Sequence, residues 1–72
     1  MKNYIVIRLA NKADGTFAAP VASYENKADA MKEYYRLCGQ AVDSTHLCDT
    51  VMLVDKYGKA VIAPETFEHP AN

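Results

Sequence analysis

The feature that most constrains the fold is a pair of apolar runs, residues 4–9 and 51–54, whose hydrophobic side chains fall on both faces of a strand. Side chains alternate sides along a strand, so Ile5 and Ile7 point to one face while Val6 points to the other. Strands that are apolar on both faces are typical of a covered sheet. Only one segment of the chain has helical periodicity, and one helix covers one face. We therefore expect a second contact on the remaining face.

Turn signals predict a hairpin in the first half of the chain. Residues 3–10 form the first expected strand, after which Asp14 and Gly15 supply the positive φ that closes a tight turn. Residues 17–24 form the second expected strand. Pro20 lies within it and has no N–H for a sheet ladder, which predicts that this strand lies at the sheet edge.

A helix is expected to follow the hairpin. Asn26 is a favoured N-cap residue, and Asp29 three positions later resembles the acidic partner of a capping box. We expect the helix to end near Gln40, because Gly39 can end a helix in a left-handed cap. The alternative is a helix that continues to about Val42, at a cost near 1 kcal/mol for the glycine relative to alanine.

The expected helix has a wide apolar sector. The stripe predicted to face the sheet contains Ala28, Met31, Tyr35, Cys38 and Val42. The flank that widens this stripe contains Ala30, Tyr34, Leu37 and Ala41. Together they cover about half of the circumference, where a helix on a single sheet needs little more than ~100°. The flank is therefore predicted to be a second contact surface.

A second hairpin is expected after the helix. Residues 47–55 and 60–63 form its strands, and Gly58 takes the left-handed conformation in the turn between them. Pro64 either stops the last strand or bulges it.

These elements predict an α+β fold, a single ββαββ domain spanning residues 1–64 with one helix on one face of a four-stranded antiparallel sheet. The expected strand order is 2-1-3-4, because the two doubly apolar strands belong in the middle and the strands with proline belong at the edges. Residues 65–72 are expected to be a C-terminal tail, in which Phe67 contacts the domain.

The candidate binding residues come from two apolar surfaces that are predicted to lie outside the contact between helix and sheet: the far sheet face and the helix flank. The predicted topology places Tyr4, Val6 and Arg8 on the sheet face away from the helix, and tyrosine is favoured at interfaces because it joins a rigid apolar body to a polar tip. Six residues are therefore predicted to contact a partner or ligand: Tyr4, Val6, Arg8, Tyr34, Leu37 and Ala41.

The sequence has no pattern typical of a metal or catalytic site. The possible zinc ligands do not form the close pairs of structural zinc sites; they are Cys38, His46, Cys48 and His69. No metal ligand, cofactor or catalytic residue is predicted, and the two cysteines are interpreted as buried thiols. Residues 43–46 contain the residue types of a hydrolase triad, but neighbours in sequence rarely converge in space, so we interpret them as a polar turn.

Charge and hydropathy bear on the class of partner. The net charge is −1 and the eight Lys and Arg are scattered, so the chain lacks the basic stripe that a nucleic-acid backbone requires. No apolar run approaches the ~20 residues that span a bilayer, and the first residues do not follow the pattern of a secretion signal. We therefore expect a cytoplasmic protein that binds neither nucleic acid nor membrane.

Three segments, residues 2–8, 28–38 and 51–58, resemble a loose group of small uncharacterised proteins encoded by phages and prophages of gut Firmicutes. The resemblance covers most of the chain and brings no established activity or site residue with it. It implies a small accessory protein of phage type in the cytoplasm of a bacterial host cell. Members of that class often act by binding host factors, including components of antiviral defence.

The predicted function is that of a non-enzymatic binding module, which forms a homodimer and acts by occluding a host protein. A second hypothesis is an oligomeric sponge that sequesters a small anionic ligand such as a signalling nucleotide, in pockets lined by tyrosine and basic side chains. A third hypothesis is a virion or assembly component.

Overall fold

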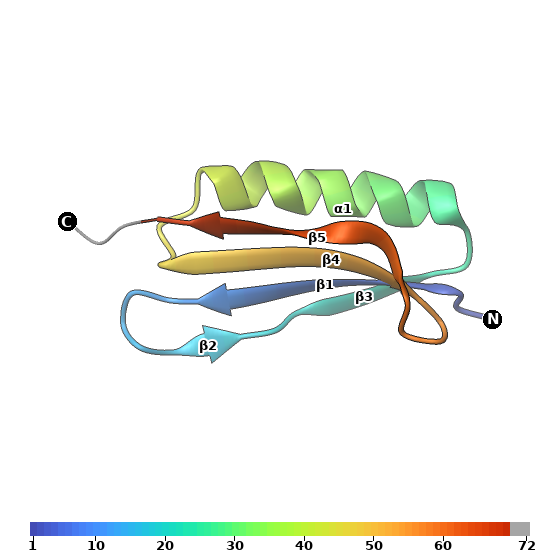
Figure 1. The fold of residues 1–72 in the computed structure, drawn as a ribbon, viewed down its shortest axis with the longest axis horizontal. Helices are drawn as coiled ribbons and strands as arrows, with labels where there is room; N and C mark the ends of the chain where they lie inside the picture. The colour runs from blue at the N-terminus through green and yellow to red at the C-terminus, as the bar shows by residue number, and fades with distance from the viewer. Residues whose placement is uncertain (70–72) are drawn as a thin grey trace.

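The computed structural model describes residues 1–69, which form one helix and one sheet (Figure 1). In chain order the elements are β1 (Tyr4–Asn11), β2 (Phe17–Ala18), β3 (Val21–Tyr24), α1 (Lys27–Val42), β4 (Cys48–Asp55) and β5 (Ala60–Glu68). The α+β class is therefore confirmed.

The sheet is antiparallel throughout, with five strands in place of the expected four. β2 and β3 both pair with one side of β1, β4 pairs with the other side, and β5 pairs with β4. The expected second strand is divided because Pro20 lacks an N–H for the ladder, although its carbonyl still accepts the Arg8 N–H at 3.1 Å. The order thus becomes β2 and β3, then β1, β4 and β5.

The helix begins as predicted and ends later than predicted. The Asn26 side chain accepts the Asp29 N–H at 2.9 Å, and its amide donates to the Asp29 carboxylate at 2.8 Å. The last helical residue is Val42, so Gly39 lies inside the helix and the expected end near Gln40 is wrong. Packing of the last turn against the sheet, where Ala41 is fully buried, outweighs the modest cost of a helical glycine.

The last strand is longer than expected. β5 continues through Pro64, and the register between β4 and β5 shifts near this point, which confirms the bulge rather than the stop. Residues 65–68 therefore belong to the sheet, and Phe67 lies opposite Asp49 and packs against the core. Residues 70–72, the end of the expected tail, lie outside the described residues.

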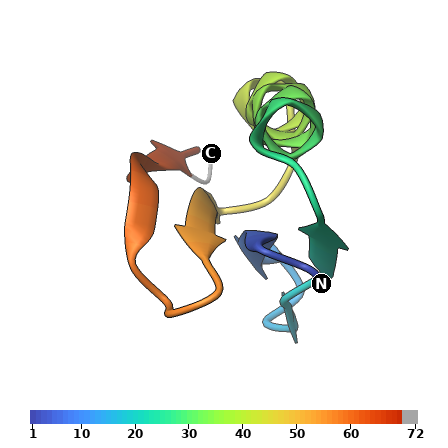
Figure 2. The same cartoon turned by 90° about the vertical axis from the view of Figure 1, so that its right-hand side faces the viewer.

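The helix covers one face of the sheet, and the core lies between the two layers (Figure 2). The buried cluster contains Val6, Ala30, Tyr34, Ala41, Val51 and Leu53. Tyr34 is its largest side chain, and its hydroxyl donates to the Ala63 carbonyl at 3.4 Å. Burial raises the pKa of Tyr34 to about 12, because the phenolate would lose its hydration.

The helix is rotated relative to the prediction. Tyr34 is buried, whereas Tyr35 is 59% exposed and Val42 is 56% exposed. Ala30 and Ala41 explain the choice, because their small side chains let the helix approach the sheet closely on either side of the large ring of Tyr34. The predicted flank is therefore the surface that faces the sheet.

Candidate functional site

The six predicted binding residues lie on the covered side of the sheet. Val6, Tyr34 and Ala41 are at most 2% exposed, and Tyr4 and Leu37 pack against them. The sixth residue, Arg8, is engaged in an ion pair with Asp49. Their predicted placement, on an open sheet face and a free helix flank, is therefore wrong.

The wrong placement of the sheet residues Tyr4, Val6 and Arg8 has one cause. Both faces of β1 and β4 are apolar, so alternation alone cannot decide which face the helix covers. The structure places Val6 and Leu53 under the helix, and the opposite face carries the other set of side chains.

We call the face away from the helix the open face. On β1 it carries Ile5, Ile7 and Leu9, which alternate with the covered Val6 and Arg8. Their cross-strand neighbours on the same face are Val54, Met52 and Thr50 on β4 and, for the first two, Ser23 and Val21 on β3. Aligned neighbours in an antiparallel sheet lie side by side, so these residues form one continuous surface.

The open face is apolar and uncharged at its centre. None of the β1, β3 and β4 residues just named carries a charge. Val21 is 61% exposed, and Phe17 on β2, opposite Asn11, is 59% exposed at one corner. Within residues 1–69, the helix lies on the other face and no element covers this one (Figure 2).

The covered face ends in a polar cluster around Asp49, which is completely buried. Arg8 Nη2 lies 3.4 Å from one carboxylate oxygen, and His46 Nδ1 lies 2.9 Å from the other. The Ser44 hydroxyl also donates to the carboxylate. Arg8 further donates to the Gln40 side chain at 3.3 Å, so the cluster ties the end of the helix and the following turn to the sheet.

The charge of Asp49 is stabilised by these contacts. Burial by itself raises the pKa of this carboxyl, but hydrogen bonds from Ser44, His46 and Arg8, with the Arg8 charge, outweigh burial and hold the pKa below its usual value. Sequence reasoning missed this cluster because its members come from β1, the turn before β4, and β4 itself.

The cluster brings serine, histidine and aspartate together without the geometry of a nucleophile and its base. Ser44 donates to Asp49 rather than to His46, and the His46 backbone N–H donates to the Ser44 hydroxyl at 3.2 Å. A hydrolase triad instead needs the hydroxyl hydrogen-bonded to the imidazole. The arrangement is that of a turn anchored to a buried carboxylate.

The other candidate ligands are dispersed. Cys38 and Cys48 are free and half-buried, and burial raises the pKa of the Cys38 thiol. His69 Nε2 lies 2.8 Å from the Ala41 carbonyl, far along the sequence from His46. Among residues 1–69 no group of three or more His, Cys, Asp or Glu side chains is placed to hold a metal ion.

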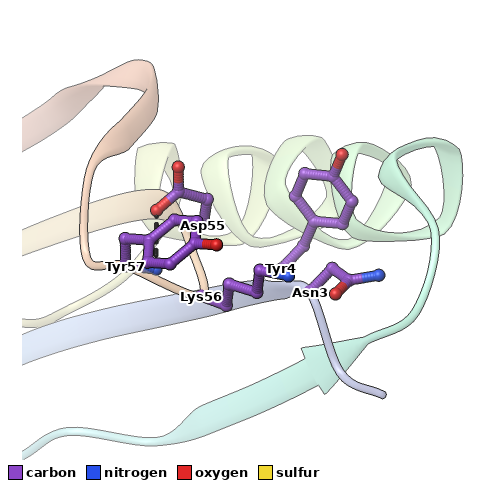
Figure 3. A pocket seen from close by; sticks show the side chains of 5 residues that line it. All are labelled: Asn3, Tyr4, Asp55, Lys56 and Tyr57. Atoms are coloured by element: carbon purple, nitrogen blue, oxygen red, sulfur yellow. Dashed lines mark hydrogen bonds between the residues drawn. The ribbon is translucent and has the colours of Figure 1, made fainter.

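A shallow pocket of about 310 Å³ lies where β1 begins and β4 ends (Figure 3). Its lining residues are Asn3, Tyr4, Asp55, Lys56 and Tyr57. Asp55 accepts the backbone N–H groups of Tyr57 and Lys59 at 2.9 and 3.0 Å, which closes the turn between β4 and β5. The Lys56 ammonium lies 5.3 Å from the centre of the Tyr57 ring. The lining contains one carboxylate, Asp55, and one ammonium, Lys56, so its formal charges cancel and the pocket has no excess positive charge to hold an anionic ligand.

Comparison with protein-family models, with curated proteins and with solved structures found no match to this chain. In the part of the chain that the structure describes, α1 is too short and too polar to cross a membrane.

Proposed function

We propose that this chain is a non-enzymatic protein-binding module that works as a homodimer, with the two copies in contact through the open face. The observation that carries the proposal is the uncharged apolar surface centred on Ile7 and Met52, which no described element covers. Burial of such an apolar surface against a partner lowers the free energy, because it removes apolar area from water.

The size of the open face supports a dimer. Strand β1 has eight residues, and a sheet face of that length and four strands wide has a planar area of about 500 Å². Stable interfaces bury ~800 Å² on each partner, which is the same order once side-chain relief is added to the planar value.

The charge of the open face supports a second copy as the occupant. A two-fold dimer sets the same patch of each copy against itself, so a patch with like charges would repel its copy. The centre of the open face has none. At its β5 margin Glu68, opposite Cys48, lies on this face, whereas Glu65, opposite Val51, lies on the covered face. Two such faces can therefore pack as two sheets do in a sandwich.

The small core gives the chain a reason to associate. Among residues 1–69, seven hydrophobic residues are buried, and three of them, Ala10, Ala30 and Ala41, contribute little area. A domain of this size gains only a few kcal/mol from its own core, roughly 3–5. A second apolar contact would add to that stability.

In the dimer the two helices face outward, away from the shared sheets. We infer that these outer surfaces bind and occlude a host factor, as the resemblance to small phage proteins implies. A virion or assembly role would instead produce oligomers larger than a dimer.

Sedimentation of the full chain tests the dimer. We expect the native chain to sediment as a dimer of 8.0 kDa subunits at micromolar concentration. Ile7→Asp places a charge at the centre of the open face and should weaken the dimer at least about hundredfold. Tyr57→Asp is the matched control, because Tyr57 is 77% exposed in a turn outside the face, and it should leave the dimer unchanged. A native chain that sediments as a monomer at these concentrations would contradict the proposal.

A further inference from the structure

An apolar depression, which we call the side groove, lies between β3 and the helix. It has a volume of about 130 Å³. Val6, Ala22 and Leu37 provide its apolar lining, and Glu33 and Arg36 stand on its helical side. The guanidinium of Arg36 is paired with the Glu33 carboxylate, so the two charges neutralise one another.

The outer edge of β3 runs beside the side groove. The Arg8 N–H donates to the Pro20 carbonyl, and the register between the two strands places Ala22 opposite Val6. Backbone groups along a strand alternate between its two neighbours, so Pro20 and Ala22 turn theirs toward β1. Val21 and Ser23 consequently direct their N–H and C=O groups outward, away from the sheet.

We propose that the free edge of β3 and the side groove together bind an extended segment of a partner protein. The segment adds a strand beside Val21 and Ser23 and places one branched aliphatic side chain in the groove. This inference rests on the proposed protein-binding role, but it does not depend on the dimer.

Volume and hydrogen bonding define the occupant. A depression of about 130 Å³ has room for a small branched aliphatic side chain such as leucine or isoleucine. The outward groups of β3 supply the main-chain hydrogen bonds that strand addition uses, while the pocket selects the side chain.

Charge distinguishes this edge from the opposite one. β5 carries Glu65 and Glu68 and is interrupted by Pro64, features that natural sheets use to block strand addition. β3 has the sequence Val-Ala-Ser-Tyr, without a charge, and the charges beside the groove are already paired. The matching partner segment is therefore uncharged at its anchor position.

An NMR titration of the isotope-labelled full chain tests the proposal. The probe is a five-residue peptide, blocked at both ends, with isoleucine between two pairs of threonines. We expect the largest amide shifts at Val21 and Ser23 and methyl shifts at Ala22 and Leu37. A peptide with aspartate in place of the isoleucine should leave these signals unchanged. Absence of binding at millimolar peptide, or shifts confined to the open face or to β5, would overturn the proposal.

Substitutions at the edge separate strand addition from simple apolar contact. Ser23→Pro removes an outward N–H and no hydrogen bond to β1, and it should weaken peptide binding by about tenfold or more. Ser23→Thr keeps the N–H and should bind like the native chain. Ala22→Leu fills the side groove and should also abolish binding, which provides a second test if the proline variant does not fold. Equal binding by a folded Ser23→Pro variant would contradict strand addition.

Sedimentation of the same samples distinguishes the two proposals. A monomeric chain that still binds the peptide at Val21 would contradict the proposed dimer and would support peptide binding at the β3 edge. A dimer whose β3 amides do not respond to the peptide would contradict peptide binding at the side groove and would support the proposed dimer. Amide shifts at Val21 that depend on protein concentration without peptide would mean that a second copy occupies the edge, and would overturn the partner assigned here.

Discussion

The covered and open faces of the sheet differ in their polar content, although β1 and β4 contribute apolar residues to both. Along β1 the covered face carries Val6 and Arg8, and the open face carries Ile5, Ile7 and Leu9. The more uniformly apolar set is the one that the helix leaves uncovered. The helix instead covers the face whose polar groups, Arg8 and Asp49, can be paired within one chain.

This difference shows how a small domain divides its surfaces. A buried charge is tolerated when its partners come from the same chain, as they do around Asp49. A face without charges needs no such partners and can be matched by any apolar surface, including its own copy. The covered face therefore determines the fold, and the open face is available for association.

The largest expected effect is on the covered face. Tyr34→Ala should lower the free energy of unfolding by ~3–5 kcal/mol, because it empties the centre of the core, and a domain this small would unfold. Tyr35→Ala, on the neighbouring exposed residue, is the matched control and should cost far less. Thermal melts check both. If Tyr35→Ala unfolds the protein and Tyr34→Ala does not, then the side of the helix that carries Tyr35 faces the sheet.

The next largest expected effect is on the pH-dependent stability that the buried carboxylate of Asp49 provides. The pKa of Asp49 is lowered on folding, so its stabilisation is complete above the unfolded value near 3.9 and is lost as the pH falls through the lowered folded value. Asp49→Asn should reduce stability at neutral pH by ~1–3 kcal/mol and flatten the loss of stability in acid. Urea melts between pH 2 and 7, about the range of this titration, measure the dependence. An Asn variant with the native acid dependence would show that Asp49 is not the responsible group.

The smallest effect on folding is expected on the open face. Thr50→Val replaces a hydroxyl that lies 3.2 Å from the Thr66 hydroxyl and is exposed. The free energy of unfolding of the monomer should change by no more than about 0.5 kcal/mol. The dimer should become tighter, because the change adds apolar area to the shared face. Sedimentation equilibrium of the variant beside the native chain measures the difference, and a weaker dimer would show that the two copies do not meet through the open face.

Local elements could be predicted from the sequence because their causes lie within a few residues. Asn26 and Asp29 form the expected cap, and Gly15 and Gly58 take the expected positive φ in their turns. The antiparallel sheet with a helix followed from the turn signals and the periodicity. Pro20 was correctly placed at an edge, although it also divides its strand in two.

The local sequence is enough to predict this set of elements and the lack of a cover on one sheet face. Which face lacks the cover, and which side of the helix meets the sheet, depend on how the helix and the strands pack together. Two overlapping apolar stripes on the helix and two apolar faces on β1 leave those choices open locally. The close approach allowed by Ala30 and Ala41 and the pairing of Arg8 with Asp49 settle them, since both depend on residues far apart in the chain.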